Sequence, residues 1–103
     1  MIGRPIVELN AHFLDNGGPG ILRADGSEAP LRTGVAVGMD CPCGCDVGLY
    51  VPFANPLDGG LPVEPRGWQR SGDTLETLTL TPSVLRRECG WHGWIRDGRA
   101  VTC

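Results

Sequence analysis

The sequence lacks the features that identify several large classes of protein. It has no run approaching the ~20 apolar residues of a transmembrane helix, so we expect no membrane insertion. The N-terminus, Met1-Ile-Gly-Arg-Pro5, has no long apolar core, so we expect no cleaved signal peptide and synthesis in a reducing cytoplasm. With a net charge of −3, the chain has no general electrostatic attraction for nucleic acid.

Sequence motifs of common catalytic sites are missing as well. The chain has no internal repeat, no Gly-rich phosphate loop, no Ser-His-Asp arrangement and no HExxH motif. It contains no lysine, and all nine of its basic residues are arginines, which we attribute to a GC-rich genome. We therefore expect a small protein that is not an enzyme.

Glycine and proline, in contrast, are abundant, with 16 Gly and 9 Pro in 103 residues. This composition limits long helices and favours turns and short strands. Strands are predicted over residues 33–39 and 47–53, which form a hairpin, over 74–81, which is the clearest β-run, and in a hairpin over 94–101. Residues 54–67 form a long Gly/Pro loop. We predict a mainly β fold, a small single domain of zinc-ribbon-like hairpins over residues 39–103, with residues 1–38 as an N-terminal extension that packs on the domain or reaches from it.

Five cysteines and two histidines are the main candidates for chemistry. Cys41-Pro-Cys43-Gly-Cys45 lies at the tip of the first predicted hairpin, and Cys89-Gly-Trp-His92 follows far along the chain. Thiolate and imidazole are ligands that zinc prefers, and a loop-rich domain gains stability from such a cross-link. We predict one structural zinc ion bound by Cys41, Cys45, Cys89 and His92, with Cys43 as a substitute for either neighbour.

Other interpretations of these residues remain open. A disulfide framework would require an oxidising compartment and would leave one cysteine over. An iron–sulfur cluster could use four of the five cysteines, whereas a redox dithiol usually has CxxC spacing at the start of a helix. Cys103 could approach the metal because the final hairpin returns toward its start. His12 is a lone histidine in an apolar stretch, which favours a satisfied side chain over a ligand.

The order of these motifs resembles a known family. The residues that carry the resemblance are Cys41-Pro-Cys-Gly-Cys45, Trp68, Thr79-Leu-Thr-Pro-Ser83 and Cys89-Gly-Trp-His-Gly-Trp-Ile-Arg-Asp-Gly98. They are similar to a family of small uncharacterised phage and prophage proteins, some labelled ammonia monooxygenase, with relatives beside bacterial ubiquitin-like conjugation genes. The resemblance covers residues 39–103. It implies a metal-binding β-domain with Cys41, Cys45, Cys89 and His92 at the ligand positions.

The monooxygenase label conflicts with the composition, because a copper or di-iron oxygenase needs several histidine or carboxylate ligands around an open site. We expect instead a phage-encoded interaction or accessory structural module that binds protein partners. A minor tail or baseplate component bound to other virion proteins is one version, located in the bacterial host cytoplasm or the phage virion.

Three alternatives would change this expectation. The first is a regulator that binds a host protein. The second is a small zinc-dependent hydrolase, which would need an open coordination position and a general base, for which Glu88 and Asp46 are candidates. The third, nucleic-acid binding, is not expected, although Arg86, Arg87, Arg96 and Arg99 could form a local basic patch.

Overall fold

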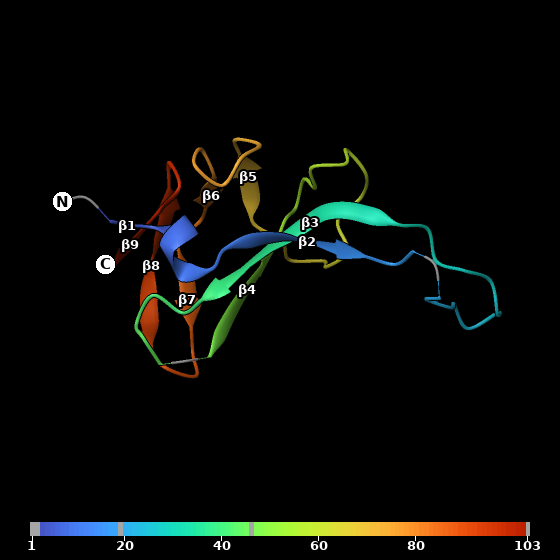
Figure 1. The fold of residues 1–103 in the computed structure, drawn as a ribbon, viewed down its shortest axis with the longest axis horizontal. Coiled ribbons are helices and arrows are strands. Elements are labelled where there is room, and N and C mark those ends of the chain that lie inside the picture. The colour runs from blue at the N-terminus through green and yellow to red at the C-terminus, as the bar shows by residue number, and fades with distance from the viewer. Residues whose placement is uncertain (1–2, 19, 46, 103) are drawn as a thin grey trace.

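The structure is a computed structural model that describes residues 3–18, 20–45 and 47–102 (Figure 1). The fold is mainly β, which confirms the predicted class. Within these ranges, no helix is long and apolar enough to cross a membrane. The elements, in chain order, are β1 (Arg4–Pro5), the short 3-10 helix η1 (Ile6–Leu9), β2 (His12–Asn16), β3 (Arg32–Asp40), β4 (Gly48–Pro52), β5 (Gln69–Ser71), β6 (Thr79–Thr81), β7 (Val84–Arg86), β8 (Trp91–Arg96) and β9 (Arg99–Thr102).

The strands form two larger antiparallel sheets and one short pair. One sheet has the order β1-β9-β8-β7, a second has the order β2-β3-β4, and β5 pairs with β6. Both hairpins predicted from the sequence are confirmed, since β3 pairs with β4 and β8 pairs with β9. Asp97 and Gly98 have φ values of 47° and 73°, as the predicted primed turn between β8 and β9 requires. In these strand orders β4 is the last strand of one sheet and β7 is the last strand of the other.

A hydrophobic core forms between the two larger sheets. Alternate residues of a strand point to opposite faces, so one face of each sheet can be buried while the other meets solvent. On β8 this alternation is complete from Trp91 to Ile95, and His92 lies on the exposed face. The buried residues of the core cluster include Ile6, Leu9, Val37, Met39, Leu49, Val51, Phe53, Leu78, Leu80, Val84, Trp91, Ile95 and Ala100.

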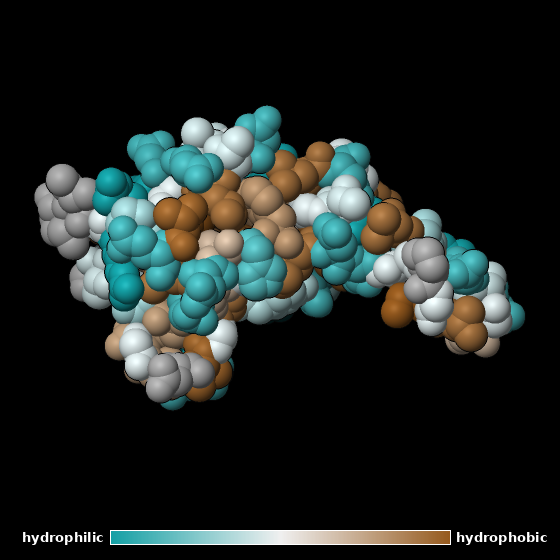
Figure 2. Space-filling view, viewed as in Figure 1, coloured by the Kyte–Doolittle hydropathy of each residue, from teal (hydrophilic) through white to brown (hydrophobic). Residues whose placement is uncertain are grey.

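The first 38 residues contribute to both sheets. β1 pairs with β9, β2 pairs with β3, and η1 buries two side chains in the common core. Residues 20–30 form an arm with a short bridge between Leu22 and Glu28, and the arm projects away from both sheets (Figures 1 and 2). β3 runs from Arg32 to Asp40, so residue 38 lies inside a strand. The division into an extension and a domain at that residue stays a prediction.

The β-run predicted over residues 74–81 is only partly a strand. Residues 79–81 form β6, whereas residues 74–77 form a turn. In this turn the Thr77 backbone N–H donates to the Thr74 carbonyl at 3.2 Å, and the two threonine hydroxyls lie 2.8 Å apart. Threonine side chains often bond to nearby groups in this way, and here the local bonds replace the strand pairing that β-propensity favours.

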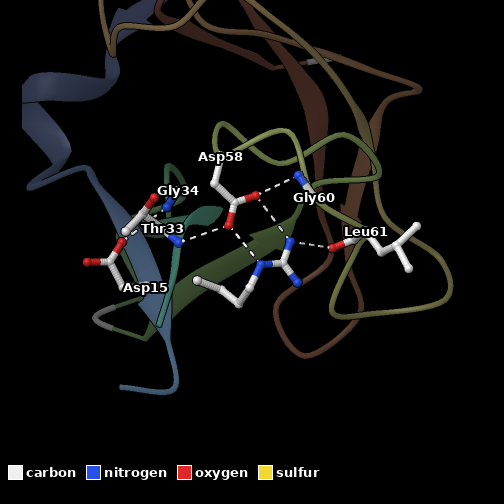
Figure 3. A network of polar contacts seen from close by, with 7 residues as sticks. Asp15, Thr33, Gly34, Asp58, Gly60 and Leu61 are labelled. Atoms are coloured by element: carbon white, nitrogen blue, oxygen red, sulfur yellow. Dashed lines mark hydrogen bonds and ion pairs between the residues drawn. The ribbon is translucent and has the colours of Figure 1, made fainter. Parts of the chain in front are cut away.

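An ion pair fixes the Gly/Pro loop 54–67 against the beginning of β3. The Arg32 guanidinium donates to both carboxylate oxygens of Asp58, at 2.7 and 3.1 Å, and to the Leu61 carbonyl at 2.6 Å. Asp58 also accepts hydrogen bonds from the backbone N–H groups of Thr33 and Gly60 (Figure 3). The hydrogen bonds from Arg32 hold the pKa of the Asp58 carboxyl well below its usual range. The loop is therefore anchored at its middle.

The lowered pKa of Asp58 predicts a pH-dependent contribution to stability. A carboxyl whose pKa falls on folding stabilises the protein above its unfolded pKa, and this contribution disappears as the pH falls through the folded pKa. We expect Asp58→Asn to lower the melting temperature at neutral pH, and the difference from wild type to shrink below about pH 4. Thermal unfolding followed by circular dichroism tests this, with Asp73→Asn in an exposed turn as control. An equal difference at all pH values would contradict it.

Candidate functional site

Four cysteine thiols converge at one end of the molecule. The sulfur atoms of Cys41, Cys43, Cys45 and Cys89 all lie within 4.8 Å of one another. Cys41 Sγ is 3.4 Å from Cys43 Sγ and 3.5 Å from Cys89 Sγ. A tetrahedron with Zn–S bonds of about 2.3 Å has sulfur–sulfur edges of about 3.8 Å. The cluster therefore has the size and chemistry to bind a metal ion.

Two tight turns bring these thiols together. In the β3–β4 turn, the Cys41 N–H donates to the Val47 carbonyl, and the Gly44 N–H donates to the Cys41 carbonyl. In the β7–β8 turn, the Gly90 N–H donates to the Arg86 carbonyl at 2.8 Å. Gly44 and Gly90 have φ values of 85° and 77°, a conformation that side chains other than glycine disfavour. Each glycine thus allows its turn to direct cysteines toward the other turn.

The thiols differ strongly in acidity. Burial raises the pKa of Cys41 to about 12. Hydrogen bonds from the Trp91 backbone N–H and from the Arg86 side chain lower the pKa of Cys89 to about 6. Arg86 Nη1 also lies 3.8 Å from Cys45 Sγ, so its positive charge offsets part of the charge of a thiolate cluster. At neutral pH Cys89 is already a thiolate, whereas Cys41 must release a proton to bind a metal.

The structure places His92 outside this cluster and Cys43 within it. Three of the four predicted ligands lie together, namely Cys41, Cys45 and Cys89. The fourth thiol of the cluster is Cys43, which was predicted as a substitute for Cys41 or Cys45. His92 instead lies on the exposed face of β8. Two further candidates from the sequence, the base Asp46 and the extra thiol Cys103, lie outside the described residues.

A second arrangement joins the hydroxyl of Ser83 to the ring of His92. His92 Nε2 and Ser83 Oγ are 2.9 Å apart, within the range expected for a nucleophile and its general base. His92 is exposed and Ser83 is half-buried, so a substrate can reach the pair. Accepting the hydroxyl proton requires the His92 tautomer that carries its own proton on Nδ1. In that tautomer the pair can perform nucleophilic catalysis.

The β7–β8 hairpin positions both members of this pair. Leu85 pairs with His92 in the register of the two strands, so Ser83, two residues before Leu85, lies diagonally opposite His92 on the same face. The Trp68 indole N–H donates to the Ser83 carbonyl at 3.2 Å and holds the serine backbone. The centre of the Trp94 ring lies 6.2 Å from the centre of the His92 ring.

The same hairpin carries Cys89 in its turn, so the thiol cluster and the Ser–His pair share one structural unit. The orange strands β7 and β8 lie side by side in Figure 1, and their connecting turn lies next to the β3–β4 turn. A metal bound by the cluster would close the hairpin at its tip. The cluster can therefore support the geometry of Ser83 and His92 without contacting a substrate.

The sequence patterns did not point to Ser83, and they indicated that a Ser-His-Asp arrangement is absent. The sequence predicts a strand over 74–81 and a hairpin over 94–101, and it predicts no strand between them. The missed signal is the short segment Val84–Arg86 before the turn that contains Cys89-Gly90, which pairs with β8. A hairpin there brings a serine and a histidine nine positions apart into contact.

Comparison with known proteins identifies the family. A family model described as "Bacterial ubiquitination-like system serine protease (BubE)" matches residues 15–103. The chain belongs to the BubE family. No curated protein and no solved structure gives a match. The BubE match extends the resemblance, expected over residues 39–103, toward the N-terminus by 24 residues (39 minus 15).

Membership of the BubE family corrects three expectations. The assignment to a phage-encoded structural or accessory module is wrong, because the family description places its members in a bacterial ubiquitination-like system. The expectation of a bacteriophage tail or other viral protein is wrong for the same reason. The expectation of a protein that is not an enzyme is also wrong, because the description names a serine protease.

The position of His92 leads to a prediction about metal binding. Cys43→Ala and Cys89→Ala should each lower the metal content of the purified protein and its melting temperature, because ligand binding and folding are coupled. His92→Ala should keep the metal, because its ring contacts Ser83 and it does not belong to the group of four thiols found among the described residues. Elemental analysis of the three variants measures this. Loss of metal from His92→Ala with full retention in Cys43→Ala would contradict the cluster.

Proposed function

We propose that this protein is a serine hydrolase of a bacterial ubiquitination-like system, with Ser83 as nucleophile and His92 as general base. The observation that carries the proposal is the 2.9 Å contact between Ser83 Oγ and His92 Nε2. The family description, a serine protease of such a system, names the chemistry that this contact supports. The substrate we propose is a protein of that system.

The proposed reaction follows from the position of the two groups. Ser83 Oγ attacks a carbonyl carbon while its proton passes to His92 Nε2. The bond to the leaving group breaks, and the leaving group takes the proton from His92, which leaves an ester between the acyl group and Ser83. Water then attacks this ester and gives one proton to His92, which passes that proton to Ser83 Oγ as the acid departs.

We propose that the thiol cluster binds one structural zinc ion through Cys41, Cys43, Cys45 and Cys89. The zinc ion would cross-link the β3–β4 turn to the β7–β8 turn, and its positive charge would balance the negative charge of the thiolates. Four protein ligands complete a tetrahedral site and leave no open position, so this arrangement supports a structural ion rather than the zinc-dependent hydrolase with Glu88 as base. Catalysis is then assigned to Ser83 and zinc to the stability of the hairpin.

A matched pair of serine variants tests the proposed nucleophile. Wild-type protein should form a covalent adduct with a fluorophosphonate probe, and Ser83→Ala should not, because the attacking oxygen is gone. Ser71→Ala, at the exposed end of β5, should react like wild type. His92→Ala should slow labelling by about 10³-fold or more, because the hydroxyl loses its base. Intact-protein mass spectrometry measures the adduct. Equal labelling of Ser83→Ala and wild type would refute the assignment.

Metal removal tests the structural role of zinc. Purified protein should contain close to one zinc ion per chain, and chelation should lower both the melting temperature and the rate of fluorophosphonate labelling, because the hairpin loses its cross-link. Added zinc should restore both. If metal-free protein is labelled at an unchanged rate, the cluster does not support the active site. If the purified protein contains iron in place of zinc, the assigned ion is wrong.

A further inference from the structure

A groove runs between edge strands of the two larger sheets, along the part of β4 that precedes Pro52, whose carbonyl accepts a hydrogen bond from the Trp68 backbone N–H. Strand β4 is the last strand of its sheet and β7 is the last strand of the other. The groove between them has a volume of about 270 Å³, and its walls include Gly48 and Tyr50 from β4 and Leu85 and Arg86 from β7. The indole of Trp68 also lines the groove and donates a hydrogen bond to the Ser83 carbonyl. The groove therefore lies beside the segment that carries the proposed nucleophile, because Val84, the residue after Ser83, and Trp68, which binds the Ser83 carbonyl, both line it.

We infer that this groove binds an extended peptide segment of the substrate protein, paired with β7 as an added strand that presents its carbonyl to Ser83. The inference rests on the proposed function of Ser83 and His92, and it adds how the substrate is recognised. An edge strand offers unpaired backbone N–H and C=O groups to an incoming chain, and extended peptides commonly bind by adding a strand to such an edge.

The order of the groups across the sheet supports this mode of binding. His92 is on β8, Ser83 immediately precedes β7, and the groove lies on the side of β7 away from β8. A carbonyl that enters from the groove meets Ser83 from the side opposite its general base. Base, nucleophile and substrate then follow one another across the sheet, as proton removal and attack require.

The walls of the groove favour a peptide as the occupant. Leu85 and Tyr50 are 52% and 50% exposed, although each is large and mostly apolar, and they face the groove from opposite strands. They can cover apolar side chains of a bound segment. Arg86 and Glu88, also in the wall, supply charges of both signs for polar groups of the chain.

Gly48 provides a way to block the groove without disturbing the fold. A Cβ atom built at Gly48 would meet only the Met39 carbonyl oxygen, at 3.9 Å, which is an ordinary contact. Gly48→Leu should therefore fold normally and place a side chain in the groove. Leu85→Ala removes an apolar contact from the opposite wall. Leu61→Ala, on the loop 54–67, is the matched control because Leu61 is 80% exposed and not part of the groove.

The test compares two esters that differ in their acyl group. p-Nitrophenyl acetate presents only a carbonyl, whereas the p-nitrophenyl ester of acetyl-Ala-Leu-Ala-Gly presents the same leaving group on an extended chain. We expect wild type to hydrolyse the peptide ester with a kcat/KM higher by roughly tenfold or more. Gly48→Leu should lose most of this preference while keeping the rate on p-nitrophenyl acetate, Leu85→Ala should lose part of the preference, and Leu61→Ala should behave like wild type.

The possible failures are distinguishable. Equal kcat/KM for the two esters in wild type, or a full preference retained in Gly48→Leu, would overturn the groove while Ser83 remains the nucleophile. Absence of both ester hydrolysis and fluorophosphonate labelling in wild type would instead overturn the proposed function. Ser83→Ala defines the background rate for both esters.

Discussion

The pairing of β7 with β8 is the interaction on which the candidate active site depends. Its register sets Leu85 opposite His92 and thereby places Ser83 within 2.9 Å of the imidazole. A shift of one residue would turn His92 to the core face, because successive side chains of a strand alternate. β7 has only three residues and one strand partner, so this register needs support from outside the strand.

That support comes from both ends of β7. Before the strand, the Trp68 indole binds the Ser83 carbonyl. After it, the turn that contains Cys89 meets the thiols of the β3–β4 turn. A metal at this point would join segments 44 residues apart (89 minus 45), and cross-links that close long loops remove the most entropy from the unfolded chain. In this account the metal contributes to catalysis by holding a strand register.

Hairpins and their turns were predicted well from local patterns, whereas the β-run over 74–81 was only partly right and the contact between Ser83 and His92 was not predicted. The β3–β4 hairpin and the Asp97-Gly98 turn were predicted because alternation and turn residues are local signals. The convergence of the two cysteine turns was also predicted, from ligand chemistry. The position of His92 outside the group of four thiols was not predicted, because it depends on which face of β8 its side chain occupies. Ser83 was missed because its contact with His92 depends on the pairing of β7 with β8, and the sequence pattern predicts no strand over residues 84–86.

A diffraction experiment on crystals of the fluorophosphonate-treated protein tests the central claim most directly. With data collected above and below the zinc absorption edge, the account predicts an anomalous peak surrounded by the sulfurs of Cys41, Cys43, Cys45 and Cys89. It also predicts continuous density from Ser83 Oγ to phosphorus, with His92 beside it. An unmodified Ser83 with the adduct on another residue, or a zinc ion bound by His92, would contradict the account.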